Sequence, residues 1–270
     1  MHTRKATEAI DQDRRRLLGT AAMGIAVAGT ASLLESHAGS AQDVTGNRLK
    51  PRQSNRSKGA DAMATHTYDN EITALLVVDP YNDFISEGGK IWNRIRAVAE
   101  ANDCVPHMLQ VLNAARKAKL RVFYAMHHRY RPGDYETWKY IAPIQKATWK
   151  SKSFEFGKWG GEIRAEFEPK PGEIVATEHW CSSGFANTDL DLQLKKHGIH
   201  QLIVIGLIAH TCIEATVRFA AELGYEITVV KDATADYSDE EMHAALDVNI
   251  PNYASAIVST EEIVASISAL

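Results

Sequence analysis

Short apolar runs rich in β-branched residues recur along the chain, separated by stretches with helical periodicity. These runs are too short for helices, and isoleucine and valine favour buried strands. Strands that alternate with helices form a parallel sheet with helices on both faces. We therefore predict a doubly wound α/β fold with a mainly parallel six-stranded sheet. The predicted strands span residues 72–78, 121–126, 173–177, 202–205, 226–230 and 256–258.

Polar side chains follow four of the predicted strands directly. Right-handed crossovers bring the carboxyl ends of parallel strands to one edge of the sheet, where α/β proteins bind their ligands. We expect the polar residues at these ends to form one site. They are Asp79, His128, Glu178, His179 and Cys212.

Cys212 lies between the strand 202–205 and an amphipathic helix that ends near Gly224. A helix N-terminus favours thiolate over thiol, and a strand–turn–helix arrangement suits a nucleophile. The alternative is a small buried core residue, which is the usual environment of a free cysteine.

Composition narrows the range of functions. A chain of 270 residues, 45% of them hydrophobic, can bury a full core. The net charge is −4 and no basic stripe is present, so we expect no nucleic-acid partner. The three cysteines form no CxxC pair, which argues against a zinc ribbon or a disulfide framework.

No nucleotide cofactor or metal is predicted. No GxGxxG follows a strand, and GxxxxGK[ST] does not occur. The adjacent His127 and His128 point in opposite directions on a strand end and lack a third partner at ligand spacing.

The chain before the first strand is typical of a leader. Residues 1–41 resemble a twin-arginine export signal, with Arg14, Arg15 and Arg16 before a glycine-diluted apolar stretch that would not make a stable membrane span. Residues 42–66 indicate a disordered linker, and 67–270 the folded domain. We expect export to the periplasm. If translation starts at Met63, the protein is cytoplasmic.

The connection 129–172 is rich in aromatic residues. A connection of this length and composition indicates a lid or a pocket wall. A subunit interface is the alternative, and one segment can serve both purposes.

Three segments together resemble the isochorismatase-like cysteine hydrolases. They are DPYNDF at 79–84, SSGFANTDL at 182–190 and GLIAHTCIEAT at 206–216. This family includes nicotinamidase, N-carbamoylsarcosine amidase, ureidoacrylate and biuret hydrolases, and isochorismatase. The resemblance extends from about residue 72 to residue 264.

The resemblance implies an Asp–Lys–Cys triad, with the aspartate at Asp79 and the cysteine at Cys212. It also implies a cis peptide at Leu207–Ile208 and an oxyanion hole made by the backbone N–H groups of Ile208 and Cys212. At the lysine position the chain has His179, and no lysine occurs between Lys170 and Lys195.

Three explanations of the missing lysine stay open. A protonated His179 replaces it, a lysine from the loop moves in, or the chemistry is altered. The loop lysines considered are Lys150, Lys152 and Lys158. Glu178 could not stabilise a thiolate, and a histidine, unlike lysine, titrates near neutral pH.

By resemblance, the chain is expected to hydrolyse a small amide, urea or carbamoyl compound through a thioester, without a cofactor. Phe84, His128 and Trp180 are the predicted pocket walls, and a homo-oligomer is implied. The alternatives are a vinyl-ether hydrolase of the isochorismatase type and a thiol redox sensor or ligand-binding descendant.

Overall fold

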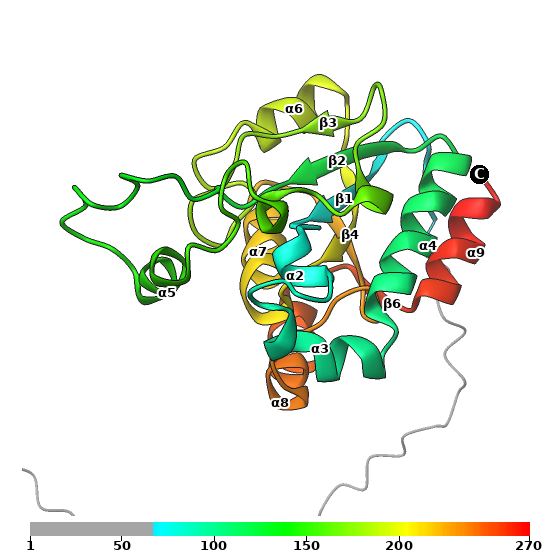
Figure 1. The fold of residues 1–270 in the computed structure, drawn as a ribbon. Coiled ribbons are helices and arrows are strands. Elements are labelled where there is room, and N and C mark those ends of the chain that lie inside the picture. The colour runs from blue at the N-terminus through cyan, green and yellow to red at the C-terminus, as the bar shows by residue number, and fades with distance from the viewer. Residues whose placement is uncertain (1–66) are drawn as a thin grey trace, which may run out of the picture. The chain divides into compact units, whose positions relative to one another are not determined.

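The computed structural model describes residues 67–270 (Figure 1). The predicted signal and linker segments lie outside the described residues. Six strands form one parallel sheet in the order β3-β2-β1-β4-β5-β6, so the predicted fold class is confirmed. The strands are β1 (Thr73–Val78), β2 (Arg121–Ala125), β3 (Ile174–Val175), β4 (Gln201–Gly206), β5 (Glu226–Val230) and β6 (Ala256–Val258).

The central strand β1 is buried on both faces. Leu75 and Val77 belong to one hydrophobic core, while Leu76 and Val78 belong to the other. Because successive side chains of a strand point to opposite faces, a continuous apolar run supplies both cores. This explains why the predicted strands lack polar alternation.

Helices cover both faces of the sheet. The first core includes side chains of α3, α4 and α9, and the second includes side chains of α6 and α7. Figure 1 shows α4 and α9 together on one side of the sheet. The α-helices are α2 (Asn82–Ile85), α3 (Trp92–Ala101), α4 (Cys104–Lys117), α5 (Pro143–Ser151), α6 (Leu190–Lys196), α7 (Glu214–Glu222), α8 (Asp239–His243) and α9 (Thr260–Ser268).

The connection 129–172 contains a helix that the sequence pattern does not predict. Helix α5 begins at Pro143, and the Ala142 N–H donates to the Gln145 side chain at 3.0 Å. Proline is favoured in the first turn of a helix because it has no N–H to satisfy. Helix α5 has no buried residue, and Figure 1 shows it standing apart from the sheet. It therefore packs no side chain into either hydrophobic core.

Strand β3 is shorter than predicted. It lies at the sheet edge, and only Ile174 and Val175 pair as a strand. The chain then continues beside β2, where the Ala176 N–H donates to Tyr124 O and the His179 N–H donates to Met126 O. This pairing carries the chain to the end of the sheet at His179. Within residues 67–270, no helix has the length and apolarity required to cross a bilayer.

Candidate active site

Asp79 is the first residue after β1 and is fully buried. Its backbone has φ +54°, in the left-handed region that aspartate tolerates better than most residues. The carboxylate oxygen Oδ1 accepts a hydrogen bond from the His127 N–H at 2.5 Å. This bond ties the carboxylate to the end of the neighbouring strand β2.

His179 lies beside Asp79, with 1% of its surface exposed. Its Nδ1 is 3.2 Å from the carbonyl oxygen of Cys181, which only accepts hydrogen bonds, so Nδ1 carries a proton. Its Nε2 is 3.3 Å from Asp79 Oδ1. Two groups that both lack a proton would repel at this distance. A proton on Nε2 would make His179 a cation that pairs with the Asp79 carboxylate at this distance.

Cys212 belongs to a single π-helical turn, Ala209–Ile213, that joins β4 to α7. Burial raises the pKa of the Cys212 thiol well above its ordinary value, and the Asp79 carboxylate raises it further. The helix N-terminus was expected to favour the thiolate, but burial and a neighbouring negative charge outweigh it. The resting sulfur is therefore a thiol that needs a base.

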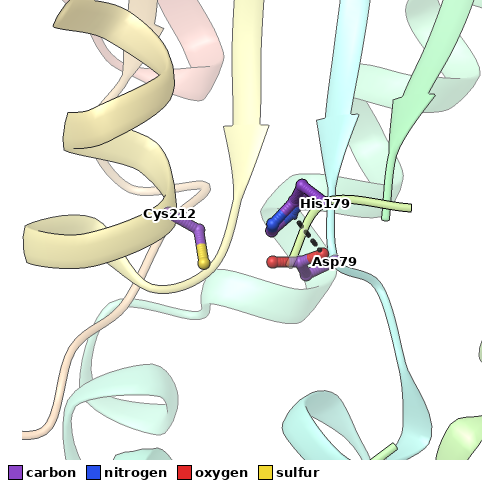
Figure 2. Close-up of side chains that lie close together, drawn as sticks. All are labelled: Asp79, His179 and Cys212. Atoms are coloured by element: carbon purple, nitrogen blue, oxygen red, sulfur yellow. Dashed lines mark ion pairs between the residues drawn. The ribbon is translucent and has the colours of Figure 1, made fainter. Parts of the chain in front are cut away.

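The three side chains converge on one point from three strand ends. A carboxylate oxygen of Asp79, a ring nitrogen of His179 and the sulfur of Cys212 all lie within 4.8 Å of one another. Figure 2 shows His179 against one oxygen of Asp79, while the other oxygen points toward the sulfur. Among the described residues, Asp79 Oδ2 and His179 Nε2 have no well-aligned hydrogen-bond partner. Unsatisfied buried polar atoms are rare, and a catalytic role is one explanation for them.

The turn before Cys212 has the expected backbone. The Leu207–Ile208 peptide is cis. The Ile208 N–H lies within hydrogen-bonding reach of the Cys212 sulfur and acts against the rise of its pKa. Gly206, with φ +125°, permits this turn, because a Cβ there would lie 2.1 Å from Val78 O. That the Ile208 and Cys212 N–H groups bind an oxyanion stays a prediction.

His127 is a site residue whose role the sequence pattern does not indicate. Besides holding Asp79, it lies with its ring centroid 5.3 Å from that of His179. Burial, together with nearby His179, lowers the pKa of His127 to about 4, so this ring is neutral. Its place after β2 was visible in the sequence, but no pattern indicates that its backbone N–H binds a carboxylate.

Neither Glu178 nor a loop lysine occupies the lysine position. Burial opposes ionisation of Glu178, but hydrogen bonds from His128 and Arg129 lower its pKa to about 2. Its carboxylate lies 2.6 Å from Arg129 Nε and 3.2 Å from His128 Nδ1. The loop lysines are all solvent-exposed: Lys150, Lys152 and Lys158. His179 is therefore the basic side chain beside Asp79.

The predicted pocket walls lie in two places. Phe84 is buried, with its ring 4.8 Å from that of Phe154. The His128 ring stacks on Trp180 at 3.6 Å. Trp180 also lines a cavity of about 290 Å³ together with Trp138, Gln145, Cys181, Ser183, Ala186 and Asn187. His127 and His128 thus point to different surroundings, as adjacent residues of an extended chain must.

Among residues 67–270, two clusters have the donor types that metal ions use. One is the group of Asp79, His179 and Cys212, and the other comprises His210, Asp236 and Glu241. In the second cluster, His210 Nδ1 donates to Asp236 at 2.6 Å, and Asp236 also accepts backbone N–H bonds from His210 and Tyr237. These protein partners already account for both carboxylate oxygens.

Comparison with known sequences identifies relatives. Residues 73–262 match the isochorismatase domain family. Ureidoacrylate amidohydrolase RutB of Caulobacter segnis is 29% identical, over 72% of this chain and 85% of that protein. Ureidoacrylate amidohydrolase RutB of Pantoea ananatis is also 29% identical, over 67% of this chain and 76% of that protein.

Solved structures show a similar fold. A cysteine hydrolase from Pseudomonas syringae pv. phaseolicola superposes with a TM-score of 0.65 at 21% identity, over 76% of this chain and 96% of that one, which is a likeness of fold. N-carbamoylsarcosine amidase from Thermoplasma acidophilum is 28% identical with a TM-score of 0.53, over 70% of this chain and 97% of that one. The family match, which covers most of the chain, shows that this protein belongs to the isochorismatase domain family.

Proposed function

We propose that the chain hydrolyses a small amide, urea or carbamoyl compound through a thioester on Cys212. Its relatives support the coarser statement that the chain is a hydrolase of non-peptide C–N amide bonds, since they are named as amidohydrolases and as an amidase. The cysteine mechanism rests on one observation, which is the convergence of Asp79, His179 and Cys212 within 4.8 Å in a buried site.

The first half of the reaction forms the thioester. Asp79 takes the proton of the Cys212 thiol, and the sulfur attacks the carbonyl carbon. The carbonyl π electrons move to oxygen, where backbone N–H groups stabilise the negative charge. The C–N bond then breaks, its electron pair stays on nitrogen, and Asp79 gives its proton to the leaving amine.

The second half returns the enzyme to its resting state. Asp79 takes a proton from a water molecule whose oxygen attacks the thioester carbon. The C–S bond breaks and the sulfur leaves with the electron pair. The proton held by Asp79 returns to Cys212. Because the resting thiol has a raised pKa, the attack depends on Asp79 as the base.

His179 keeps Asp79 ionised in this scheme. A buried carboxylate without a counter-charge takes up a proton, and a protonated Asp79 accepts no proton from the thiol. A cationic His179 at 3.3 Å supplies the counter-charge that the family lysine would supply. The site therefore carries one positive and one negative side chain beside a neutral thiol.

The alternative functions differ in their demands on the sulfur. A redox-sensing cysteine is accessible and has a lowered pKa. Cys212 is 4% exposed and its pKa is raised, which disfavours a sensor. A vinyl-ether hydrolase of the isochorismatase type uses this fold without a cysteine nucleophile. Product analysis with a vinyl ether distinguishes it from an amidase.

The test is a screen of small amides, ureas and carbamates against the wild-type protein and a Cys212→Ser variant, followed by mass spectrometry of the quenched reaction. We expect an acyl adduct on the peptide that contains Cys212 in the wild type only. Turnover by Cys212→Ser at the wild-type rate would contradict covalent catalysis by sulfur.

Export and oligomerisation are further proposals. The twin-arginine pattern in residues 1–41 supports export, and mass spectrometry of the mature N-terminus tests it. A chain that begins at Met63 would contradict export. Size-exclusion chromatography with light scattering tests the homo-oligomer.

A further inference from the structure

Two polar residues of the DPYNDF segment, Asn82 and Asp83, have no part in the proposed mechanism. Both are buried, with 7% and 2% of their surface exposed. They belong to the short helix α2, which follows Asp79. Buried amides and carboxylates are costly unless they are hydrogen-bonded, so their partners indicate what they do.

Three of those partners, Phe154, Trp159 and Glu162, lie in residues 152–164, which we call the strap. Asp83 Oδ2 accepts the Phe154 N–H at 2.7 Å, and Asp83 Oδ1 accepts the Lys90 N–H at 3.0 Å. The Asn82 side-chain amide donates to Trp159 O at 2.9 Å, and the Asn82 backbone N–H donates to Glu162 O at 3.0 Å. The two residues thus bind the strap along much of its length.

Gly160 shows how closely the strap approaches Asp83. A Cβ at this position would lie 2.2 Å from Asp83 Oδ1, far closer than a carbon and an oxygen that are not bonded can approach. Only glycine allows the strap to pass the carboxylate here. No salt bridge to Asp83 is present in the described part of the chain, and its oxygens are satisfied by backbone N–H groups.

The strap places Phe154 in the layer next to the catalytic side chains. Phe154 is 2% exposed and has φ +55°. Its ring stacks on Tyr81 at 4.9 Å and lies 5.2 Å from the ring of His127. His127 in turn holds Asp79 through its N–H. The ring therefore packs against the residues that surround Asp79.

Much of the rest of the strap is exposed to solvent, including Lys152, Phe156, Lys158 and Trp159. Besides the hydrogen bonds with Asn82 and Asp83, the strap is held by the Phe156 N–H, which donates to Tyr130 O at 2.9 Å, and by the Arg164 N–H, which donates to Pro80 O at 3.0 Å. Asp79, His179 and Cys212 are almost without solvent contact. Because Cys212 is only 4% exposed, a substrate needs a wider opening to the sulfur than this arrangement provides.

We propose that Asn82 and Asp83 are positioning residues that hold the strap closed, so that Phe154 forms a movable wall of the substrate pocket. This inference rests on the proposed function for its kinetic consequence, but the closure itself does not depend on the reaction. It explains why the segment after the catalytic aspartate has buried polar residues.

Two variants weaken the closure by different routes. In Asp83→Asn, the side-chain NH₂ group replaces one acceptor and faces a backbone N–H that it cannot bind. In Gly160→Ala, the new methyl group displaces the carboxylate without a change of charge. Glu155→Gln is the matched control, because it removes only a half-exposed ion pair with Lys90 at 3.7 Å.

The first measurement is hydrogen exchange of the strap. We expect exchange in the peptide containing Phe154 to become about tenfold faster or more in Asp83→Asn and Gly160→Ala, as for a lost hydrogen bond to a charged group. Glu155→Gln should exchange like the wild type. Unchanged exchange in both variants would overturn the proposal.

The second measurement is alkylation of Cys212 by iodoacetamide, followed by mass spectrometry of its peptide so that the more exposed Cys181 is counted separately. We expect faster alkylation of Cys212 when the strap opens. Phe154→Ala removes the ring but leaves the Asp83 carboxylate intact, and it should also speed alkylation of Cys212. This variant tests the proposal if Asp83→Asn does not fold. Unchanged alkylation in all three variants would show that the strap does not limit access to Cys212.

Kinetics on the amide substrate separate positioning from a merely structural role. A loosened wall raises KM about tenfold, whereas a loss of folded enzyme lowers the apparent kcat and leaves KM unchanged. A fall in kcat alone would therefore contradict the proposal. If the wild type hydrolyses no amide, the proposed function fails, while exchange and alkylation still test the strap.

Discussion

Replacement of His179 by glutamine or lysine tests the most unusual feature of the site. At 3.3 Å, a cationic His179 and the Asp79 carboxylate attract by about 5 kcal/mol in a medium of effective dielectric constant about 20. Desolvation of both groups offsets much of this attraction. Removal of one partner from a buried pair nevertheless costs about 3–5 kcal/mol, because the other charge is left uncompensated.

His179→Gln keeps a polar side chain but removes the charge. We expect Asp79 to take up a proton in this variant, which disables it as a base. Loss of general-base catalysis lowers the rate by about 10²- to 10⁴-fold. His179→Lys keeps a positive charge beside Asp79. Its kcat/KM should therefore stay within about tenfold of wild type, which corresponds to about 1.4 kcal/mol.

The assay is kcat/KM for the amide found in the screen, measured from pH 5 to 10, together with urea unfolding of each variant. An active, fully stable His179→Gln would refute the counter-ion role. An inactive but folded His179→Lys would refute the equivalence of the two cations.

The remaining predictions concern the sulfur, His128 and metal ions. Cys212→Ala and Asp79→Asn should each remove nearly all turnover with circular dichroism unchanged, and residual wild-type activity in either would contradict its role. Burial opposes a charged His128, but hydrogen bonds to Glu178 and Asp134 raise its pKa. The stabilisation by charged His128 is therefore complete at acid pH and is lost as the pH rises through the raised pKa. In urea unfolding, the wild type should lose about 1 kcal/mol of unfolding free energy over this pH range, and His128→Gln should not. Dialysis against EDTA should leave amidase activity unchanged, because the sulfur and Asp79 supply the chemistry. Loss of activity that added zinc reverses would contradict this and would indicate a metal ion at Asp79, His179 and Cys212.

The strap, residues 152–164, shows what local sequence patterns do not predict. The aromatic content of residues 129–172 indicates a lid or a pocket wall, yet nothing in it distinguishes Phe154, which is buried, from Phe156, which is 46% exposed. The difference arises from Asp83, 71 residues earlier in the chain, which binds the Phe154 N–H. A contact across this separation leaves no periodic signal.

The same holds for helix α5 and strand β3. Helix α5 has no buried side chain, so packing against the core does not account for it. Strand β3 pairs over two residues only, and its continuation to His179 depends on backbone hydrogen bonds to Tyr124 and Met126. Those partners are set by the register of the sheet, which is a property of the assembled fold.

The sequence by itself determined the order of strands and helices and the residues at the strand ends. Apolar runs of strand length need burial on both faces, and a parallel sheet between two layers of helices provides it. Its motifs also placed Asp79, Cys212 and the cis peptide before Cys212.

Only the tertiary structure decided which of the strand-end groups meet and in what charge state. His179 lies against Asp79, whereas Glu178, its neighbour, turns toward His128 and Arg129 because adjacent residues of an extended chain point in opposite directions. Burial then raises the thiol pKa and makes the sulfur dependent on its carboxylate. Solvent exclusion and distances between residues far apart in the chain exist only after folding, so no local pattern contains them.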